Sequence, residues 1–218
     1  MTKARLDGLS WLLVGSVLFV IQSAALVCSS PGAGQDFNSS YYSARCLVQH
    51  CDPYKESEVL RIYHAGGGAP LASAAARLVA ARHIYPPTAF SFMVPFAMLP
   101  WGPARILWLT LTAGSLIFAS FLAWDLGANY APVLSGALAG FSLANDVELI
   151  SLGNPSGIAI SLCVVAVWCF LRERFASAGI LCLAVSLALK PQVTGLVWLY
   201  FLLAGGVYRK RALQTLLV

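Results

Sequence analysis

The run LSWLLVGSVLFVIQSAALVC, residues 9–28, decides the class of fold. It holds no charged residue, and as a helix its roughly 20 residues would be about 30 Å long, which is the thickness of a bilayer core. Lys3 and Arg5 precede it, and basic residues in this position mark the cytoplasmic side of a span. A cleaved signal peptide is the alternative, because residues 29–34 are mostly small, but its apolar region rarely exceeds about 15 residues. We therefore expect a retained membrane anchor with its N-terminus inside.

The composition of the whole chain agrees with a membrane location. Of the 218 residues, 59% are hydrophobic and only 11% are charged, whereas soluble proteins average about 25% charged residues. The net charge of +5 would suggest nucleic acid in a soluble protein, but here the basic residues cluster at the ends of apolar runs and anchor the cytoplasmic membrane face. We therefore expect an integral membrane protein with no nucleic-acid partner. No glycine-rich phosphate loop or zinc-spaced motif is present, so we expect no cofactor and no metal.

Further apolar runs follow the first one along the chain. Together they predict an all-α fold, a polytopic membrane helical bundle of about six to seven apolar helices. We expect residues 1–218 to form one integral membrane domain. Because the chain ends in an apolar Leu-Leu-Val, this domain is either complete or the N-terminal part of a longer protein. The runs are residues 88–99, 104–124, 132–150, 158–171, 176–189 and 193–207.

The basic residues set a condition on how these runs cross the membrane. If every run crossed, the basic residues at 172–174 and 209–211 would lie on the side opposite the basic N-terminus. That arrangement would violate the positive-inside rule twice. One run is therefore not a simple crossing. The candidates are 88–99, which is short and interrupted by Pro95, and 132–150, whose second half is acidic.

A polar segment of about fifty residues separates the first two apolar runs and is too long for a simple connector. We expect residues 30–87 to form an outer loop at the water face of the membrane. Within it, residues 56–64 and the alanine-rich residues 71–82 have helical potential, and Arg77 and Arg82 would keep the second helix at the interface.

The beginning of this loop reads Gln-Asp-Phe-Asn-Ser-Ser-Tyr-Tyr, residues 35–42. Two carboxylates, Asp36 and Asp52, bracket tyrosines that offer both stacking surfaces and hydroxyl groups, a chemistry suited to holding a sugar. Simpler roles remain open. Asp36 could cap a helix, Asp52 could belong to a turn before Pro53, and the tyrosines could be interfacial anchors.

Two of the six cysteines, Cys46 and Cys51, lie in the polar segment. They could form a disulfide if that segment faces an oxidising compartment. Their spacing also resembles that of two ligands of a metal site, but the remaining ligands that such a site needs do not follow in the sequence. The choice between a disulfide and free thiols stays open.

Several short motifs occur in an order that resembles glycosyltransferase family 87, within the multi-spanning enzymes of the C-type fold that use polyprenyl-phosphate sugars. The resemblance extends over most of the chain, but position 154 departs from the family, which usually has glutamine there. The motifs are Asp36-Phe37 with Tyr41-Tyr42, Asp52-Pro53-Tyr54, Tyr85-Pro86-Pro87, Gly153-Asn154 and Lys190-Pro191.

The resemblance implies transfer of a hexose, commonly mannose, from a polyprenyl-phosphate donor to a hydroxyl group of a lipid or glycan acceptor. It implies a multi-pass protein of the cell membrane with its active-site loop on the extracytoplasmic side. Carried onto this chain, it makes Asp36 the catalytic base. Phosphate leaves readily as an anion, so one carboxylate is enough, whereas glycosidases need two. The expected substrate-binding residues are Tyr41, Tyr42, Arg45, Asp52, Tyr54, Arg82, Tyr85, Asn154 and Lys190.

Each of these roles has an alternative. Lys190 could extend to the membrane interface instead of binding the donor phosphate, for which Arg45 and Arg82 are further candidates. At the level of function, a secondary transporter or a non-catalytic membrane assembly subunit are the alternatives. The Gly-Ala-Leu-Ala-Gly face at residues 136–140 is the sequence feature that favours a subunit.

Overall fold

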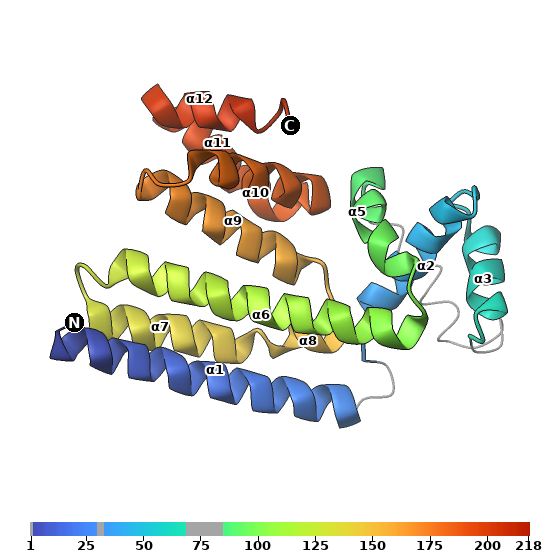
Figure 1. Ribbon diagram of the computed structural model, residues 1–218, viewed down its shortest axis with the longest axis horizontal. Coiled ribbons are helices and arrows are strands. Elements are labelled where there is room, and N and C mark those ends of the chain that lie inside the picture. The colour runs from blue at the N-terminus through green and yellow to red at the C-terminus, as the bar shows by residue number, and fades with distance from the viewer. Residues whose placement is uncertain (1, 30–32, 69–84) are drawn as a thin grey trace.

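A computed structural model of the chain describes residues 2–29, 33–68 and 85–218 (Figure 1). These residues form helices joined by turns, with no strand in the described ranges, which confirms the all-α prediction. The predicted helix 71–82, together with Arg82, lies outside the described residues.

Three helical segments are long and apolar enough to cross a membrane. Helix α1 (Lys3–Ser29) and helix α6 (Trp101–Gly127) have 27 residues each. The third segment, Pro132–Leu152, consists of α7 (Pro132–Asn145) and α8 (Val147–Leu152). All three lie side by side in one layer (Figure 1).

A second layer of helices packs on α6, and α9 (Ser156–Leu171) makes this contact. It continues with α10 (Ala176–Leu189) and α11 (Pro191–Ala204), which have 14 residues each and are followed by α12 (Gly206–Gln214). As helices, α9 to α11 are about 21 to 24 Å long, somewhat less than the thickness of a typical bilayer core of about 30 Å.

Glycines bring α1 and α7 into backbone contact. A Cβ atom on Gly15 would collide with the backbone of Gly140, and one on Gly136 would collide with the backbone of Gly8. Such close approach needs small residues on both helices. The small-residue face at 136–140 is therefore used within the chain.

Helix α5 (Pro87–Ala97) is the shortest of the four short apolar helices in the described residues. It has 11 residues, about 16 Å as a helix, with Pro95 inside it. Its end lies against α2 (Gln35–Val48), where the Leu99 carbonyl accepts a hydrogen bond from Tyr41. Its start lies against Tyr54, in the segment that follows α2: the Tyr54 ring packs on Phe90, and the Tyr54 hydroxyl donates to the Tyr85 carbonyl. Of the two candidates that the charge pattern left open, the structure therefore favours residues 88–99.

Both ends of α5 thus pack on the segment that holds α2 and Tyr54, and the basic residues gather at the far end of the bundle. Arg5 and Arg172 line one pocket there. Arg211 donates a hydrogen bond to the Phe170 carbonyl at the end of α9, so the basic segment 209–211 lies at this end too. The conflict with the positive-inside rule disappears.

The polar segment differs from the expected loop because its first part is a buried helix. Helix α2 packs against α5, and the ring of Phe37 stacks on both Trp101 and Trp108 of α6, with centroids 5.5 and 5.2 Å apart. The predicted helix 56–64 is present as α3 (Glu56–Ala65). These short helices form a cap at the end of the bundle opposite the basic end (Figure 1).

Candidate functional site

Asp36 lies in the first turn of α2, where a tight turn fixes it against α8. Gly34 directly precedes α2 with a φ of 87°, a left-handed conformation that glycine adopts without strain. Its N–H group donates to the Ser151 carbonyl over 2.7 Å. The Asp36 side chain is 4% exposed, so a carboxylate predicted in a water-facing loop is in fact almost fully buried.

Asn154 is aimed at Asp36 by the glycine before it. Gly153 ends α8 with a φ of 65°, and its carbonyl accepts a hydrogen bond from Trp108 Nε1 over 2.9 Å. A Cβ atom on Gly153 would lie 2.8 Å from Cβ of Phe37, so a larger residue would push α2 away. The pair Gly153-Asn154 is thereby held between α2 and α6.

A chain of hydrogen bonds joins Asp36 to Lys190 through Asn154. Asn154 Nδ2 donates to Asp36 Oδ2 over 2.6 Å, and Lys190 Nζ donates to Asn154 Oδ1 over 3.1 Å. Three residues that are far apart in the sequence thus form one polar group. The resemblance named all three, but nothing in the sequence indicated that they touch.

Lys190 sits at the junction of α10 and α11 and is half-buried. Its ammonium group also donates to Ser156 Oγ and lies 5.5 Å from the centre of the Tyr85 ring. Burial lowers the pKa of Lys190 below its ordinary value, because a low-polarity environment disfavours the charged form. The lysine therefore points into the polar group instead of extending to the interface.

Tyr54 and Tyr85 belong to the same region. The Tyr54 hydroxyl donates to the Tyr85 carbonyl over 2.8 Å. Asp52, in contrast, is exposed and its Oδ1 accepts the Tyr54 N–H group over 2.9 Å, which is the geometry of a turn. A direct contact of Asp52 with substrate stays a prediction.

Tyr41, Tyr42 and Arg45 lie about one and a half to two and a half turns further along α2 and contact other parts of the protein. Arg45 donates to the Tyr41 hydroxyl over 2.7 Å, and that hydroxyl donates to the Leu99 carbonyl. The Tyr42 ring stacks on Trp101, and burial raises the pKa of its hydroxyl. Both rings are buried, so stacking on a sugar would require them to move.

Two residues of the site were missed by sequence reasoning. Ser156 binds Lys190, and Arg105 extends from α6 to within 3.5 Å of where a Cβ atom on Gly34 would lie. The Arg105 Nε atom is buried and has no hydrogen-bond partner among the described residues. A single arginine at the start of an otherwise uncharged span was the available signal.

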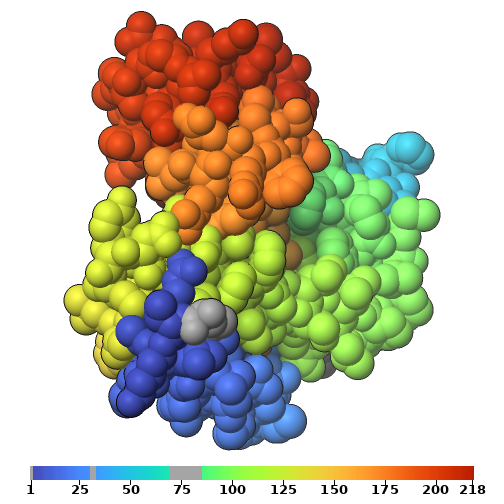
Figure 2. Space-filling model, turned by 60° about the vertical axis from the view of Figure 1, so that its left-hand side comes forward, coloured from blue at the N-terminus to red at the C-terminus, as the bar shows by residue number. Residues whose placement is uncertain are grey.

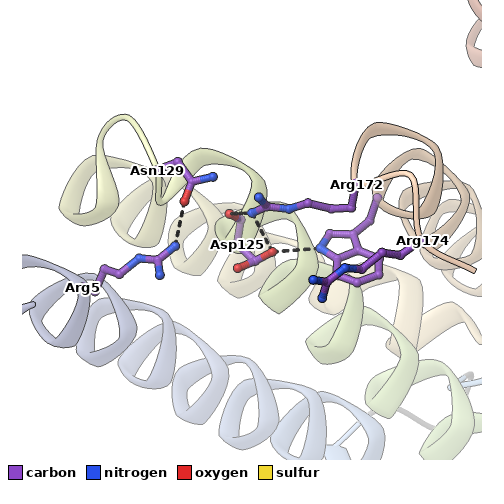
Figure 3. A pocket seen from close by; sticks show the side chains of 6 residues that line it. Arg5, Asp125, Asn129, Arg172 and Arg174 are labelled. Atoms are coloured by element: carbon purple, nitrogen blue, oxygen red, sulfur yellow. Dashed lines mark hydrogen bonds and ion pairs between the residues drawn. The ribbon is translucent and has the colours of Figure 1, made fainter. Parts of the chain in front are cut away.

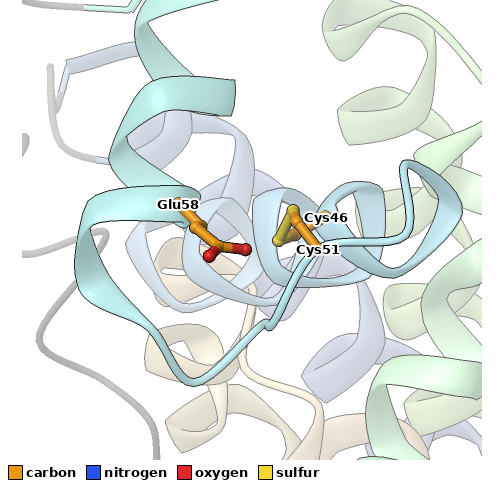
Figure 4. A group of neighbouring side chains, drawn as sticks. All are labelled: Cys46, Cys51 and Glu58. Atoms are coloured by element: carbon orange, nitrogen blue, oxygen red, sulfur yellow. A yellow bond between two sulfur atoms is a disulfide. The ribbon is translucent and has the colours of Figure 1, made fainter.

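The two cysteines of the polar segment form a disulfide, Cys46–Cys51, near Glu58 (Figure 4). The sulfur atoms and a Glu58 oxygen lie within 4.8 Å of one another. However, disulfide sulfurs are not thiolate ligands, and Glu58 binds Lys55 and the Asp52 N–H group. The group therefore braces the end of α2 against α3.

An apolar groove of about 370 Å³ lies between α5, α6, α9 and α10. Ile158, two residues after Ser156, is one of its lining residues. The others are Phe92, Phe96, Leu111, Ser115, Leu162, Leu181, Cys182 and Val185.

Comparison with known proteins gives one finding. The family model of glycosyltransferase family 87 matches residues 83–217, more than half of the chain. The match includes Tyr85, Asn154 and Lys190, while Asp36 lies before it. No curated protein and no solved structure matches the chain.

Proposed function

Since this chain belongs to glycosyltransferase family 87, we propose that it transfers a hexose, with mannose as the first candidate, from a polyprenyl phosphate to a hydroxyl group of a lipid or glycan acceptor. The observation that carries the proposal is the hydrogen-bonded chain from Asp36 through Asn154 to Lys190. It holds a carboxylate and an ammonium group on opposite sides of one amide.

The reaction needs the carboxylate at the acceptor oxygen and the ammonium group at the phosphate. The acceptor oxygen attacks the anomeric carbon, Asp36 takes the proton of that hydroxyl group, and the bond from the anomeric carbon to the phosphate oxygen breaks. The electron pair of that bond leaves with the polyprenyl phosphate, whose growing negative charge Lys190 stabilises. General-base help of this kind contributes about 10² to 10⁴ in rate.

The apolar groove supports a lipid-linked donor. Lys190 binds Ser156, and the groove starts two residues later on the same helix at Ile158. A polyprenyl chain lying in this groove would bring its phosphate to Lys190 and its sugar toward Asp36. A soluble nucleotide sugar has no lipid chain that such a groove could hold.

The basic residues support an orientation. They gather at the end of the bundle opposite Asp36, and the positive-inside rule puts such an end in the cytoplasm. The site would then face the extracytoplasmic side of the cell membrane. A disulfide between Cys46 and Cys51 agrees with an oxidising compartment there.

The small-residue face no longer favours an assembly subunit, because Gly136 and Gly140 are used against α1. A transporter would need neither a carboxylate such as Asp36 to take a proton from a hydroxyl group nor a groove to hold a lipid chain.

The direct test is an assay of donor use. Membranes containing the full chain are incubated with radiolabelled polyprenyl-phosphate mannose, polyprenyl-phosphate glucose or a nucleotide-linked mannose, and labelled glycolipid and glycan are counted. We expect label only from a polyprenyl-phosphate sugar, and none in matched membranes carrying the Asp36→Asn/Lys190→Gln double variant. Transfer from the nucleotide sugar alone would contradict the proposal.

A further inference from the structure

A second polar pocket, of about 420 Å³, lies at the basic end of the bundle, opposite Asp36 (Figure 3). It forms where the N-terminal turn of α1, the C-terminal end of α6 and the C-terminal end of α9 meet. Figure 2 shows this face, with the blue start of α1 below the orange segment that contains the end of α9. The lining residues are Arg5, Asp125, Asn129, Trp168, Arg172 and Arg174.

The pocket carries more positive charge than the protein neutralises. Asp125 is the one carboxylate among the lining residues. It forms an ion pair with Arg172 over 2.8 Å and accepts a hydrogen bond from Trp168 Nε1 over 2.9 Å. The Arg5 guanidinium group donates one hydrogen bond to a described residue, to Asn129 Oδ1 over 2.9 Å. The Arg174 guanidinium group makes no hydrogen bond or ion pair with any described residue, and the Arg172 Nε atom is buried without a partner among those residues. The guanidinium groups of Arg5 and Arg174, which line the pocket, therefore keep donors that no described residue uses.

Guanidinium groups in such an arrangement match a phosphate. The planar guanidinium group binds phosphate oxygens through two parallel hydrogen bonds, and it loses less hydration energy than an ammonium group does. Basic pockets between helices at the cytoplasmic level of a membrane are suited to acidic lipid headgroups.

An apolar groove adjoins the pocket and distinguishes a lipid from free phosphate. Ala123 and Leu126 lie on either side of Asp125 on α6, and Val167 precedes Trp168 on α9. They line a cavity of about 360 Å³ whose other lining residues come from α9 and α11 and are almost all apolar. A phosphate held by the arginines would leave its acyl chains beside this groove.

We propose that this pocket binds the phosphate group of an anionic phospholipid and thereby fastens the ends of α1, α6 and α9 together at the membrane face where the basic residues gather. The site is separate from the Asp36 group and does not depend on the reaction carried out there.

The test uses the purified full chain in a neutral detergent. Lipid retention is measured by native mass spectrometry, and the midpoint of thermal unfolding is measured with added phosphatidylglycerol, phosphatidylcholine or inorganic phosphate. We expect phosphatidylglycerol to bind and to raise the midpoint, while phosphatidylcholine and inorganic phosphate do neither at equal concentration.

Variants separate the pocket from general surface charge. Arg174→Gln removes a side chain that contacts no described residue through a hydrogen bond or ion pair, so it should fold normally and lose about tenfold or more in affinity for phosphatidylglycerol, the effect of a charged hydrogen bond. Lys210→Gln removes the same charge from an exposed position outside the pocket and should change the affinity less than about twofold. Equal losses in both variants would overturn the proposal in favour of non-specific attraction. Inorganic phosphate binding as tightly as the lipid would overturn it in favour of a soluble anion site.

Discussion

At the scale of single residues, Asn154 decides how the site is arranged. Its Oδ1 atom accepts hydrogen bonds from Lys190 Nζ and from the Ser156 N–H group, the latter over 2.8 Å. The NH₂ group of the amide must therefore face Asp36, and an NH₂ group needs an acceptor opposite it. Asp36 Oδ2 is such an acceptor, so the amide fixes the order of the polar group, with Asp36 on one side and Lys190 on the other.

Lys190 leads to a prediction about pH. Its pKa is lowered by burial, so its positive charge is present at low pH and is lost as the pH rises through that lowered pKa, earlier than for an exposed lysine. We expect kcat/KM for the lipid donor to fall on the alkaline side for this reason. In Lys190→Arg the fall should move to higher pH, because guanidinium stays charged. The pH profile of donor kinetics checks this expectation.

The companion variant Lys190→Gln removes the charge at every pH. We expect a loss of about 1.5 to 3 kcal/mol, roughly tenfold to a hundredfold in kcat/KM for the donor, with membrane insertion unchanged. Unaltered donor kinetics would return Lys190 to the role of an interfacial anchor.

The sequence named three residues of this polar group but not their contacts. Asp36, Asn154 and Lys190 follow from short motifs, and each is a local signal. The burial of Tyr41 and Tyr42 could not be predicted, because the rings that cover them, such as Trp101, come from a helix about sixty residues later. For the same reason no local pattern linked Arg105 to Gly34.

At the scale of helices, apolar runs predicted the membrane segments well and the cap poorly. The run 176–189 coincides with α10, and 104–124 lies within α6. Helix α2 was predicted only in the alternative in which Asp36 caps a helix, because its serines and its asparagine favour turns and caps in isolation. Its burial against α5 and α6 overrides that preference.

The glycine contact between α1 and α7 gives a stability prediction. Gly15→Ala should lower the free energy of unfolding by about 1 to 3 kcal/mol or more, because the added methyl group meets the Gly140 backbone and neither helix can retreat cheaply. Thermal unfolding in detergent measures the effect.

Gly114→Ala on α6 is the matched control. A Cβ atom there has open space around it, so the substitution should be neutral or slightly stabilising through helix propensity. Equal destabilisation by both substitutions would mean that the contact between α1 and α7 does not hold the bundle together.

At the scale of the whole molecule, charge separates the two ends. Positive side chains dominate the end that carries the arginine pocket, and the cap with Asp36 covers the other. From the sequence alone, the positions of the basic residues conflicted with the positive-inside rule unless one apolar run was not a simple crossing. The sequence could not decide between residues 88–99 and 132–150, because that choice depends on where both ends of α5 pack. The basic residues concerned are Lys3, Arg5, Arg172, Arg174, Arg209, Lys210 and Arg211.

Topology mapping tests this separation. A Cβ atom on Gly67, which follows α3, would meet no described atom within 4 Å, and Tyr130 is 91% exposed in the turn between α6 and α7. A short epitope inserted at Gly67 should be reached by antibody on intact cells, and one inserted at Tyr130 only after permeabilisation. Detection of both on the same side would show that α6 does not connect the two faces.

The central claim is that Asp36 is the base of a sugar transfer from a lipid phosphate, and the kinetics of Asp36→Asn test it most directly. The asparagine keeps the size of the side chain and can still accept the hydrogen bond from Asn154, but it cannot take a proton from the acceptor. We expect kcat to fall by about 10² to 10⁴ with little change in KM for the donor. Asp52→Asn, which alters an exposed turn, should keep kcat within about twofold. Near-normal turnover in Asp36→Asn at equal protein levels, with turnover abolished in Asp52→Asn, would contradict the account and move the base to Asp52.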